Sequence, residues 1–283
     1  MNRRAFLAAL ALAACRRSPI AKKDGPATRI VSLSPSTTET VFAIGAGASL
    51  VGRSRYCDYP PEVLKLPQVG GYVDPSFEAI LALSPDLVTG ARGPSGDALT
   101  KRLEERGIAT YFPPTESIAA IAEMIRGLGA RTARGADAER VIDTMNARLA
   151  KVKEEASSAP PRRVLLVFGL EPLAVAGPAS FPDEMLRLAG ANNVITEGGA
   201  YPTIGVEHAL RLDPDVILDA AMAEGRAKER LAKDAPGWSS VRAVKEGRVR
   251  RLDDEAVLRP GPRVGDGVAA IAAAIRSAME PSR

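Results

Sequence analysis

Short apolar runs alternate with amphipathic stretches along most of this chain. The apolar runs predict strands, and the stretches with one apolar face predict helices. The expected strands are residues 29–33, 87–88, 108–112, 163–168, 216–218 and 248–252. The expected helices are residues 36–45, 77–83, 97–106, 118–128, 183–188 and 264–279. Because this alternation is typical of a largely parallel sheet covered by helices, it predicts an α/β fold.

The first expected helix begins in a segment rich in serine and threonine. Ser36 is followed three residues later by Glu39, which is the spacing of a capping box. In that arrangement the two side chains accept backbone N–H groups that the first turn of a helix leaves without partners. We therefore expect Ser36 and Glu39 to cap the start of this helix.

One amphipathic stretch, residues 132–157, is longer than the others. Its apolar face is formed by Ala138, Val141, Ile142, Met145, Leu149 and Val152. A helix of this length extends about 39 Å, which is more than one lobe needs. Pro160 and Pro161 then stop the pattern. We interpret the stretch as a rod that joins two lobes, and an ordinary helix within a single domain is the alternative.

The chain also repeats one pattern of residues. Segments 72–88 and 201–217 lie 129 positions apart and share the spacing of a tyrosine, a glutamate and a Pro-Asp pair. These residues are Tyr72, Glu78, Pro85 and Asp86 in one copy and Tyr201, Glu207, Pro214 and Asp215 in the other. The period exceeds the roughly 20–50 residues of solenoid units. The repeat therefore predicts two related lobes, residues 29–131 and 160–283, with a ligand cleft between them.

The N-terminal segment is typical of an export signal. Arg3 and Arg4 precede an apolar run, residues 5–14, that is too short to span a bilayer. Residues 12–15 resemble a bacterial lipobox, which implies cleavage before Cys15 and lipid attachment to its thiol. A plain secretory signal is the alternative. We interpret residues 1–14 as a signal peptide and 15–28 as a lipidated tether. The arginine pair also resembles a twin-arginine signal, and Sec export stays open.

Composition argues against several functional classes. The formal charge is +4, or +2 without the two arginines of the signal, which is too small to favour a nucleic-acid partner. The single histidine, His208, gives neither a Ser–His pair nor a ligand set for free zinc, and we interpret it as a surface residue. Cys57 is the one cysteine besides Cys15. It is interpreted as a small, partly buried thiol, with ligation of a bound metal chelate as the alternative.

Several motifs together resemble one family. They are residues 30–39 (IVSLSPSTTE), residues 58–61 (DYPP), the duplicated glutamates and residues 259–263 (RPGPR). The combination resembles the periplasmic binding proteins of ABC importers for cobalamin, ferric siderophores and haem, and among them the vitamin B12-binding proteins. The resemblance extends over residues 29–280. It implies two Rossmann-like α/β lobes with mostly parallel sheets, joined by one long rigid α-helix, with small closure motions.

The resemblance assigns a docking role to the duplicated glutamates. In that family one glutamate on each lobe docks onto arginines of the membrane permease, and the matching residues here are Glu78 and Glu207. Two carboxylates at opposite ends of a rigid body fix its orientation on a symmetric partner, and Glu–Arg contacts are strong when partly desolvated. The alternative is that both acids only stabilise helix N-termini.

The resemblance also implies a set of ligand-binding residues. Tyr56, Tyr72 and Tyr201 match aromatic residues of the cobalamin pocket. Arg259 matches an arginine that contacts the ligand, and Glu255 matches an acidic ligand contact. A tyrosine can stack on a large planar ring, and an arginine offers a fork of hydrogen-bond donors.

Some positions depart from the family pattern. Tyr72 and Tyr201 stand where the cobalamin binders have tryptophan, and Ala174 stands where they have a further aromatic residue. We expect Trp238, the single tryptophan, in the core of the second lobe. The ligand therefore stays open among cobalamin, another corrinoid, haem and a siderophore.

The sequence thus predicts a monomeric, lipid-anchored binding protein in the periplasm or at the cell surface. Its partners would be an ABC permease dimer with its ATPase subunits and a small-molecule ligand, namely a cobalt corrinoid or an iron chelate. No cofactor, resident metal or catalytic residue is expected. An exported enzyme or a ligand sensor that uses the same cleft is the alternative of another class.

Overall fold

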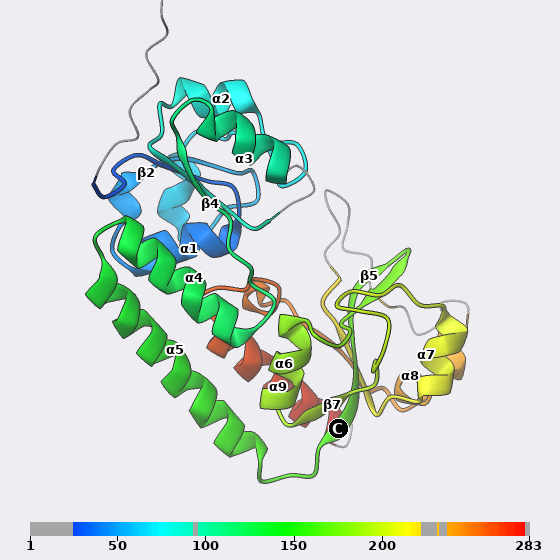
Figure 1. The fold of residues 1–283 in the computed structure, drawn as a ribbon. Helices are drawn as coiled ribbons and strands as arrows, with labels where there is room; N and C mark the ends of the chain where they lie inside the picture. The colour runs from blue at the N-terminus through cyan, green and yellow to red at the C-terminus, as the bar shows by residue number, and fades with distance from the viewer. Residues whose placement is uncertain (1–24, 93–95, 222–230, 232–236, 281–283) are drawn as a thin grey trace, which may run out of the picture.

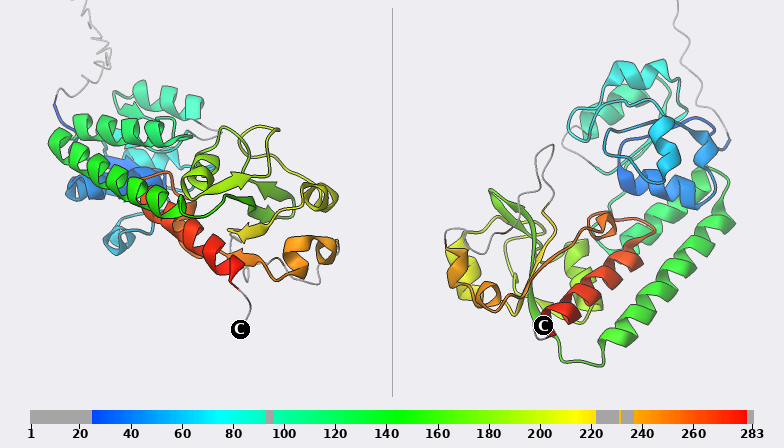
Figure 2. Two further views of the ribbon diagram at one scale, coloured as in Figure 1. Left: turned by 90° about the horizontal axis from the view of Figure 1, so that it is seen from below. Right: turned by 180° about the vertical axis from the view of Figure 1, so that it is seen from behind.

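A computed structural model describes residues 25–92, 96–221, 231 and 237–280. Within these residues the chain forms two β-sheets, each covered by helices, and helix α5 (Gly135–Ala156) runs along one side of both (Figure 1). Helix α9 (Val264–Met279) packs beside α5 (Figure 2). The predicted signal peptide, Cys15 and most of the tether lie outside the described residues.

The N-terminal sheet has four parallel strands in the described residues, in the order β2-β1-β3-β4. They are β1 (Ile30–Ser32), β2 (Leu50–Arg53), β3 (Leu87–Thr89) and β4 (Ala109–Tyr111). Neighbouring residues of a strand point to opposite faces. The core side that contains Ile30 and Leu87 includes residues of α1 (Pro35–Ala43) and α4 (Ile118–Arg131). The side that contains Val31 and Val88 includes residues of α2 (Phe77–Ala82) and α3 (Gly96–Glu104).

The C-terminal sheet is mostly parallel. Its strands are β5 (Arg162–Leu170), β6 (Leu173–Val175), β7 (Ala191–Asn193), β8 (Val216–Asp219) and β9 (Val249–Arg251). The order is β6-β5-β8-β9, with β7 also paired to β5, and the β5–β6 pair is antiparallel. Residues of α6 (Phe181–Leu188) and α9 pack on one face. Residues of α7 (Val206–Leu212) and α8 (Arg242–Lys245) pack on the other. Short 3₁₀ helices are η1 (Gly47–Ser49), η2 (Pro61–Lys65), η3 (Trp238–Ser240) and η4 (Glu255–Val257).

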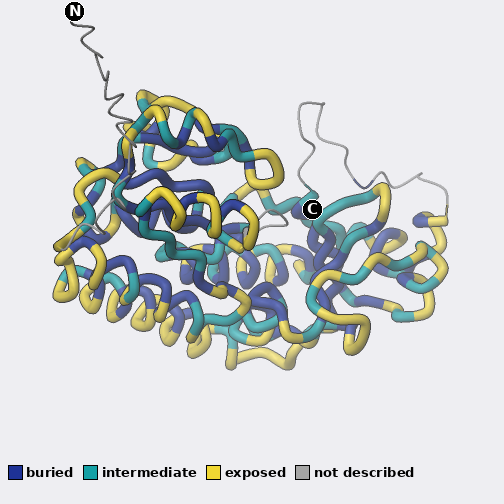
Figure 3. Tube along the Cα trace, turned by 45° about the horizontal axis from the view of Figure 1, so that its top comes forward, coloured by how far each residue is buried: buried dark blue, intermediate teal, exposed yellow. Residues whose placement is uncertain are grey.

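One apolar core continues from the first sheet into the second. It contains Ile30 of β1 and Val164 of β5, together with buried residues of α4, α5 and α9. Helix α5 turns its buried side inward and its polar side to solvent, as the exposed outer turns in Figure 3 show. A large rotation of one lobe against the other would expose this core to water, at about 25 cal/mol per Å² of apolar surface. The packing therefore favours small relative motions.

The duplicated Pro-Asp pair has a structural role that is the same in both lobes. The carboxylate of Asp86 accepts from the backbone N–H of Arg29, and that of Asp215 accepts from the backbone N–H of Arg163. Each aspartate thereby joins the start of its own strand to the start of the central strand beside it. The arginines complete the match, because Arg29 donates to the Leu83 carbonyl and Arg163 to the corresponding Leu212 carbonyl. The fold therefore explains why the Pro-Asp pair is repeated, whereas the repeated tyrosine and glutamate need another explanation.

Three details differ from the sequence predictions. The N-cap of α1 is Ser34, which accepts from the Thr37 N–H, so the predicted Ser36–Glu39 capping box is wrong. The long helix begins at Gly135 rather than residue 132, because α4 continues to Arg131. Strands β2, β6 and β7 were not predicted. They are three or four residues long, which is too short for an alternating pattern to stand out.

Candidate functional site

A cleft pocket of about 380 Å³ lies between the lobes. One wall is formed by the segments that follow β1, β2, β3 and β4, and the other includes Phe181 of α6, Tyr201 and the segment 258–260 after β9. Ligands of open α/β sheets bind outside the carboxyl ends of the strands. The fold therefore brings the corresponding loops of both lobes to one site, of a volume usual for small-molecule pockets.

Four of the five predicted ligand-binding residues line this cleft. Tyr56, Tyr72 and Tyr201 contribute aromatic rings, and Arg259 belongs to the lining of the C-terminal lobe. Glu255 is not among the lining residues but forms an ion pair with Arg259. The structure thus brings residues more than a hundred positions apart in the sequence to one cavity.

The hydroxyl groups of two cleft tyrosines are bound by the protein itself. Tyr72 donates to the carbonyl oxygen of Arg92 at 2.8 Å, and Tyr201 donates to the Glu116 carboxylate at 2.8 Å. Burial and the negative charge of Glu116 raise the pKa of Tyr72. Burial, together with the hydrogen bond to Glu116, raises the pKa of Tyr201 more strongly. Both phenols therefore stay protonated, and Tyr201 also packs edge-on against Phe168.

Arg259 is the centre of a partly buried ion cluster that joins the two lobes. Its side chain is 8 % exposed and pairs with Glu39 of α1 at 3.0 Å, with Asp58 at 2.7 Å and with Glu255. Burial lowers the pKa of Arg259, but the bonds to Glu39 and Asp58 outweigh it, and the pKa lies above its ordinary value. The guanidinium therefore remains a cation that three protein carboxylates already engage.

Glu39 holds a second arginine of the C-terminal lobe. Its carboxylate, 2 % exposed, accepts from Nε of Arg263 at 2.7 Å and from Nη2 at 2.8 Å. This two-bond fork is the strong geometry for an arginine and a carboxylate. The Arg263 guanidinium also lies 4.0 Å from the centre of the Tyr59 ring. Glu39, which local spacing assigned to a helix cap, in fact ties α1 to the residues just before α9.

Cys57 lies outside the cleft. It is fully buried, and its sulfur accepts a hydrogen bond from Thr38 at 3.1 Å and lies 3.5 Å from the Ser54 hydroxyl. Burial raises the pKa of the thiol. The thiol is thus buried fully, where the sequence suggested partial burial, and a ligand in the cleft would not reach this sulfur.

The family model described as periplasmic binding protein matches residues 30–256 of this sequence. The chain belongs to the periplasmic binding protein family. It is 33 % identical over 239 residues to the vitamin B12-binding protein of Salmonella paratyphi A, and the match covers 84 % of this chain and 86 % of that protein. It is 30 % identical over 255 residues to the ABC transporter substrate-binding lipoprotein YvrC of Bacillus subtilis. That match covers 87 % of this chain and 79 % of that protein.

A solved structure supports the same assignment. The fold is similar to that of a periplasmic haem-binding protein from Pseudomonas aeruginosa, with 32 % identity, a TM-score of 0.78 and coverage of 91 % of this chain and 95 % of that one. The predicted two-lobed α/β fold is confirmed. Because these relatives are binding proteins of transporters, this family member is a binding protein, and the prediction that it is not an enzyme is also confirmed.

The duplicated glutamates of this periplasmic binding protein occupy matching places outside the cleft lining. Glu78 is the second residue of α2, and Glu207 is the second residue of α7. Both are exposed; the Glu78 side chain is 83 % exposed and lies 3.8 Å from Arg102. Helices α2 and α7 lie on different lobes, away from α5 (Figure 1).

Three other residues discussed from the sequence lie outside the cleft lining. Trp238 is buried in the apolar cluster beside β5 and β8, as predicted. His208 lies half-buried on α7. Ala174 lies in β6, bridged to Thr203, and is not among the residues that line the cleft.

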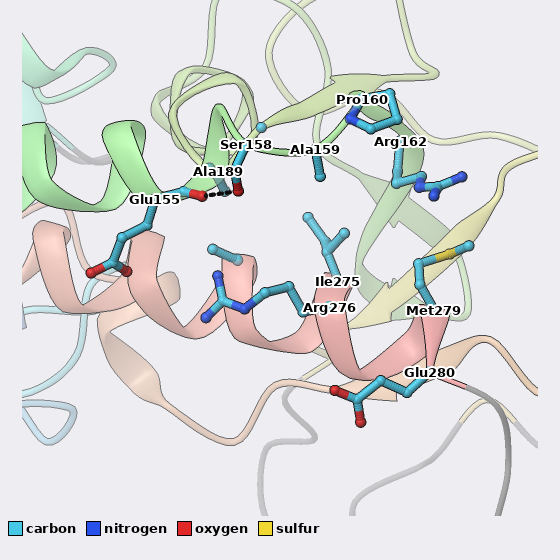
Figure 4. A pocket seen from close by; sticks show the side chains of 13 residues that line it. Glu155, Ser158, Ala159, Pro160, Arg162, Ala189, Ile275, Arg276, Met279 and Glu280 are labelled. Atoms are coloured by element: carbon cyan, nitrogen blue, oxygen red, sulfur yellow. Dashed lines mark hydrogen bonds between the residues drawn. The ribbon is translucent and has the colours of Figure 1, made fainter.

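A second hollow, of about 310 Å³, lies near the end of α5. Figure 4 shows Ile275 of α9 pointing toward Ala159, with Pro160 and Met279 beside them. The described residues that line it include none of the predicted ligand-binding residues, and all come from the end of α5 and the C-terminal lobe. This hollow is therefore distinct from the site between the lobes.

Within residues 25–92, 96–221, 231 and 237–280, no group of three His, Cys, Asp or Glu side chains is arranged to hold a metal ion. In the same part of the chain no helix combines the length and apolarity needed to cross a bilayer.

The ion cluster makes a prediction about stability. Replacement of Glu39 by glutamine should lower the free energy of unfolding by about 3 kcal/mol or more, because it leaves Arg259 and Arg263 without their shared buried carboxylate. Glu139→Gln is the matched control, since Glu139 pairs with Arg126 at the surface and should contribute about 0–1 kcal/mol. Urea unfolding of the three proteins measures both changes. Equal losses in the two variants would contradict the role given to Glu39.

Proposed function

We propose that this chain captures a corrinoid ligand between its lobes and delivers it to the permease of an ABC importer. The observation that carries the proposal is the presence of Tyr72 and Tyr201, from corresponding places of the sequence repeat, on one cleft lining. Aromatic side chains on opposite lobes suit a large planar ring. The likeness to the vitamin B12-binding protein of Salmonella paratyphi A supports a corrinoid as that ring.

The proposed roles of the cleft residues follow from their positions. Tyr56, Tyr72 and Tyr201 pack on the ring, and Arg259 contacts its periphery with Glu255 beside it. The continuous core and the ion cluster hold the cleft in shape before the ligand arrives. Binding then requires little ordering of the protein, which favours affinity.

The exposed glutamates are proposed as the contacts to the permease. Glu78 and Glu207 have the same place on helices of the two lobes, so a permease dimer with two equivalent arginine clusters would receive one from each lobe. Their exposure keeps both carboxylates available for charge-assisted contacts. Such contacts also steer the approach of the two proteins.

The N-terminus is proposed to carry a lipid anchor at Cys15, a residue outside the described structure. The likeness to the Bacillus subtilis lipoprotein YvrC supports this proposal. Two acyl chains attached at one residue are enough for stable membrane attachment. The anchored chain would act as a monomer in the periplasm or at the cell surface.

Calorimetric titration tests the ligand assignment. We expect saturable one-to-one binding of cyanocobalamin or cobinamide, weakened about tenfold or more by Tyr72→Ala, because a stacking face is lost. Leu210→Ala is the control, since Leu210 is as exposed as Tyr72 (41 % each) but lies outside the cleft lining. Binding of haem or a ferric siderophore alone would overturn the corrinoid assignment and retain the transport role.

Docking is tested by separating binding from uptake. The double variant Glu78→Ala/Glu207→Ala should bind ligand normally but reduce permease-dependent uptake into membrane vesicles by about tenfold or more, because two charge-assisted contacts are lost. Glu123→Ala/Glu139→Ala removes two exposed carboxylates from α4 and α5 as a control. Uptake that persists at the normal rate in the Glu78/Glu207 variant would count against docking. If the unaltered protein binds ligand but supports no permease-dependent uptake, the ligand-sensor alternative is favoured.

Fractionation of cells tests the anchor. The unaltered protein should sediment with membranes, and Cys15→Ala should move it to the soluble fraction, because it removes the thiol to which the acyl chains would be attached. Detection of the same membrane fraction for both proteins would show that Cys15 is not the anchor.

A further inference from the structure

Glu116 is a cleft residue that sequence analysis did not identify. It lies between β4 and α4, directly before Ser117, whose side chain caps α4 by accepting from the Ala120 N–H. Its Oε2 accepts the Tyr201 hydroxyl proton at 2.8 Å. Glu116, Tyr72 and Tyr201 all belong to the lining of the same cavity. The turn before α4 thus brings a carboxylate to the same cavity as the aromatic side chains proposed to hold the ring.

The hydrogen-bonding groups that Glu116, Tyr72 and Tyr201 offer a ligand are acceptors. The Tyr201 proton is directed to Glu116, and the Tyr72 proton is directed to the carbonyl of Arg92. A phenol that donates its one proton retains oxygen lone pairs that only accept, and a carboxylate also only accepts. The site therefore matches a ligand edge that donates hydrogen bonds.

The charged groups of the cleft lining and of the ion cluster also favour a ligand edge without carboxylates. Among the described residues that line it, Arg259 has the one cationic side chain, and Glu39, Asp58 and Glu255 already engage it. Including Arg263, which Glu39 also binds, the cluster has two cations and three carboxylates, a formal charge of 2 − 3 = −1. Glu116 adds a further negative charge on the cleft wall.

We propose that Glu116 is a specificity-determining residue that selects ligands with uncharged or cationic, hydrogen-bond-donating edges, such as carboxamides, over ligands with carboxylates there. This inference rests on the proposed function, because it assigns a chemical class to the ligand of the same cleft. A carboxamide N–H can donate to Glu116 or to the oxygen of Tyr201. A carboxylate offers these groups only acceptors, and the bound ring excludes the water that would otherwise separate them.

The experiment compares pairs of ligands that share a ring and differ in peripheral charge. The probes are cobinamide, the same corrin with its carboxamides hydrolysed to carboxylates, iron protoporphyrin with its two carboxylates, and the diamide of that porphyrin. Each is titrated into the purified full-length protein at low ionic strength. Whichever ring binds, the amide form should bind on the order of tenfold more tightly than the carboxylate form.

Glu116→Gln keeps the size of the side chain, removes its charge and adds donors. It should bring the amide-to-carboxylate ratio close to one, mainly by improving carboxylate binding. Glu123→Gln makes the same charge change on the outer side of α4 and should leave the ratio unchanged. Raised salt should reduce the preference of the unaltered protein, because it screens the charge of Glu116.

The outcomes separate this inference from the proposed function. Equal affinities for the two forms of a ring, or a ratio that Glu116→Gln leaves unchanged, would overturn the role of Glu116 and leave the transport role standing. Binding of the porphyrins alone would overturn the corrinoid assignment, while the diamide-to-diacid ratio would still decide the role of Glu116. Failure of all four probes to bind would overturn the proposed function and this inference with it.

Discussion

The relative placement of the two lobes depends on one buried carboxylate, that of Glu39. It comes from the first helix of the N-terminal lobe and binds Arg259 and Arg263, more than two hundred residues later in the chain. Removing three charges from water is costly, and the fork geometry offsets that cost only while the lobes keep their positions. Arg259, so held, lies both in the cluster and in the lining of the cleft. The position of the site is therefore coupled to the contact between the lobes.

The apolar core, like the ion cluster, keeps the two lobes in fixed relative positions. It passes from the first sheet through α4, α5 and α9 into the second sheet, so the lobes share buried surface as well as a connecting helix. A cleft built on such a base is largely formed before ligand arrives. In the proposed function, recognition then depends on the groups that the loops present, namely the rings of Tyr72 and Tyr201 and the carboxylate of Glu116, more than on a large closure.

Periodicity alone predicts much of the fold, because α5 and α9 are long enough for an apolar face to stand out. The repeat also predicts two lobes, and its Pro-Asp pairs make matching backbone contacts. A local sequence pattern does not predict a contact with a residue that is distant in the chain. The spacing of Glu39 fits a helix cap, but its partners lie in the other lobe. Glu116 has no local signal at all, since only the folded β4–α4 turn brings it to Tyr201.

The most direct test is a crystal structure of the protein with cobinamide, compared with the ligand-free protein. A corrin ring between Tyr72 and Tyr201, with a peripheral amide within hydrogen-bond distance of Glu116, is the predicted result. The Glu39 contacts to Arg259 and Arg263 should be unchanged between the two structures. A ligand bound elsewhere, or a cleft that forms only after those contacts break, would contradict a preformed corrinoid site.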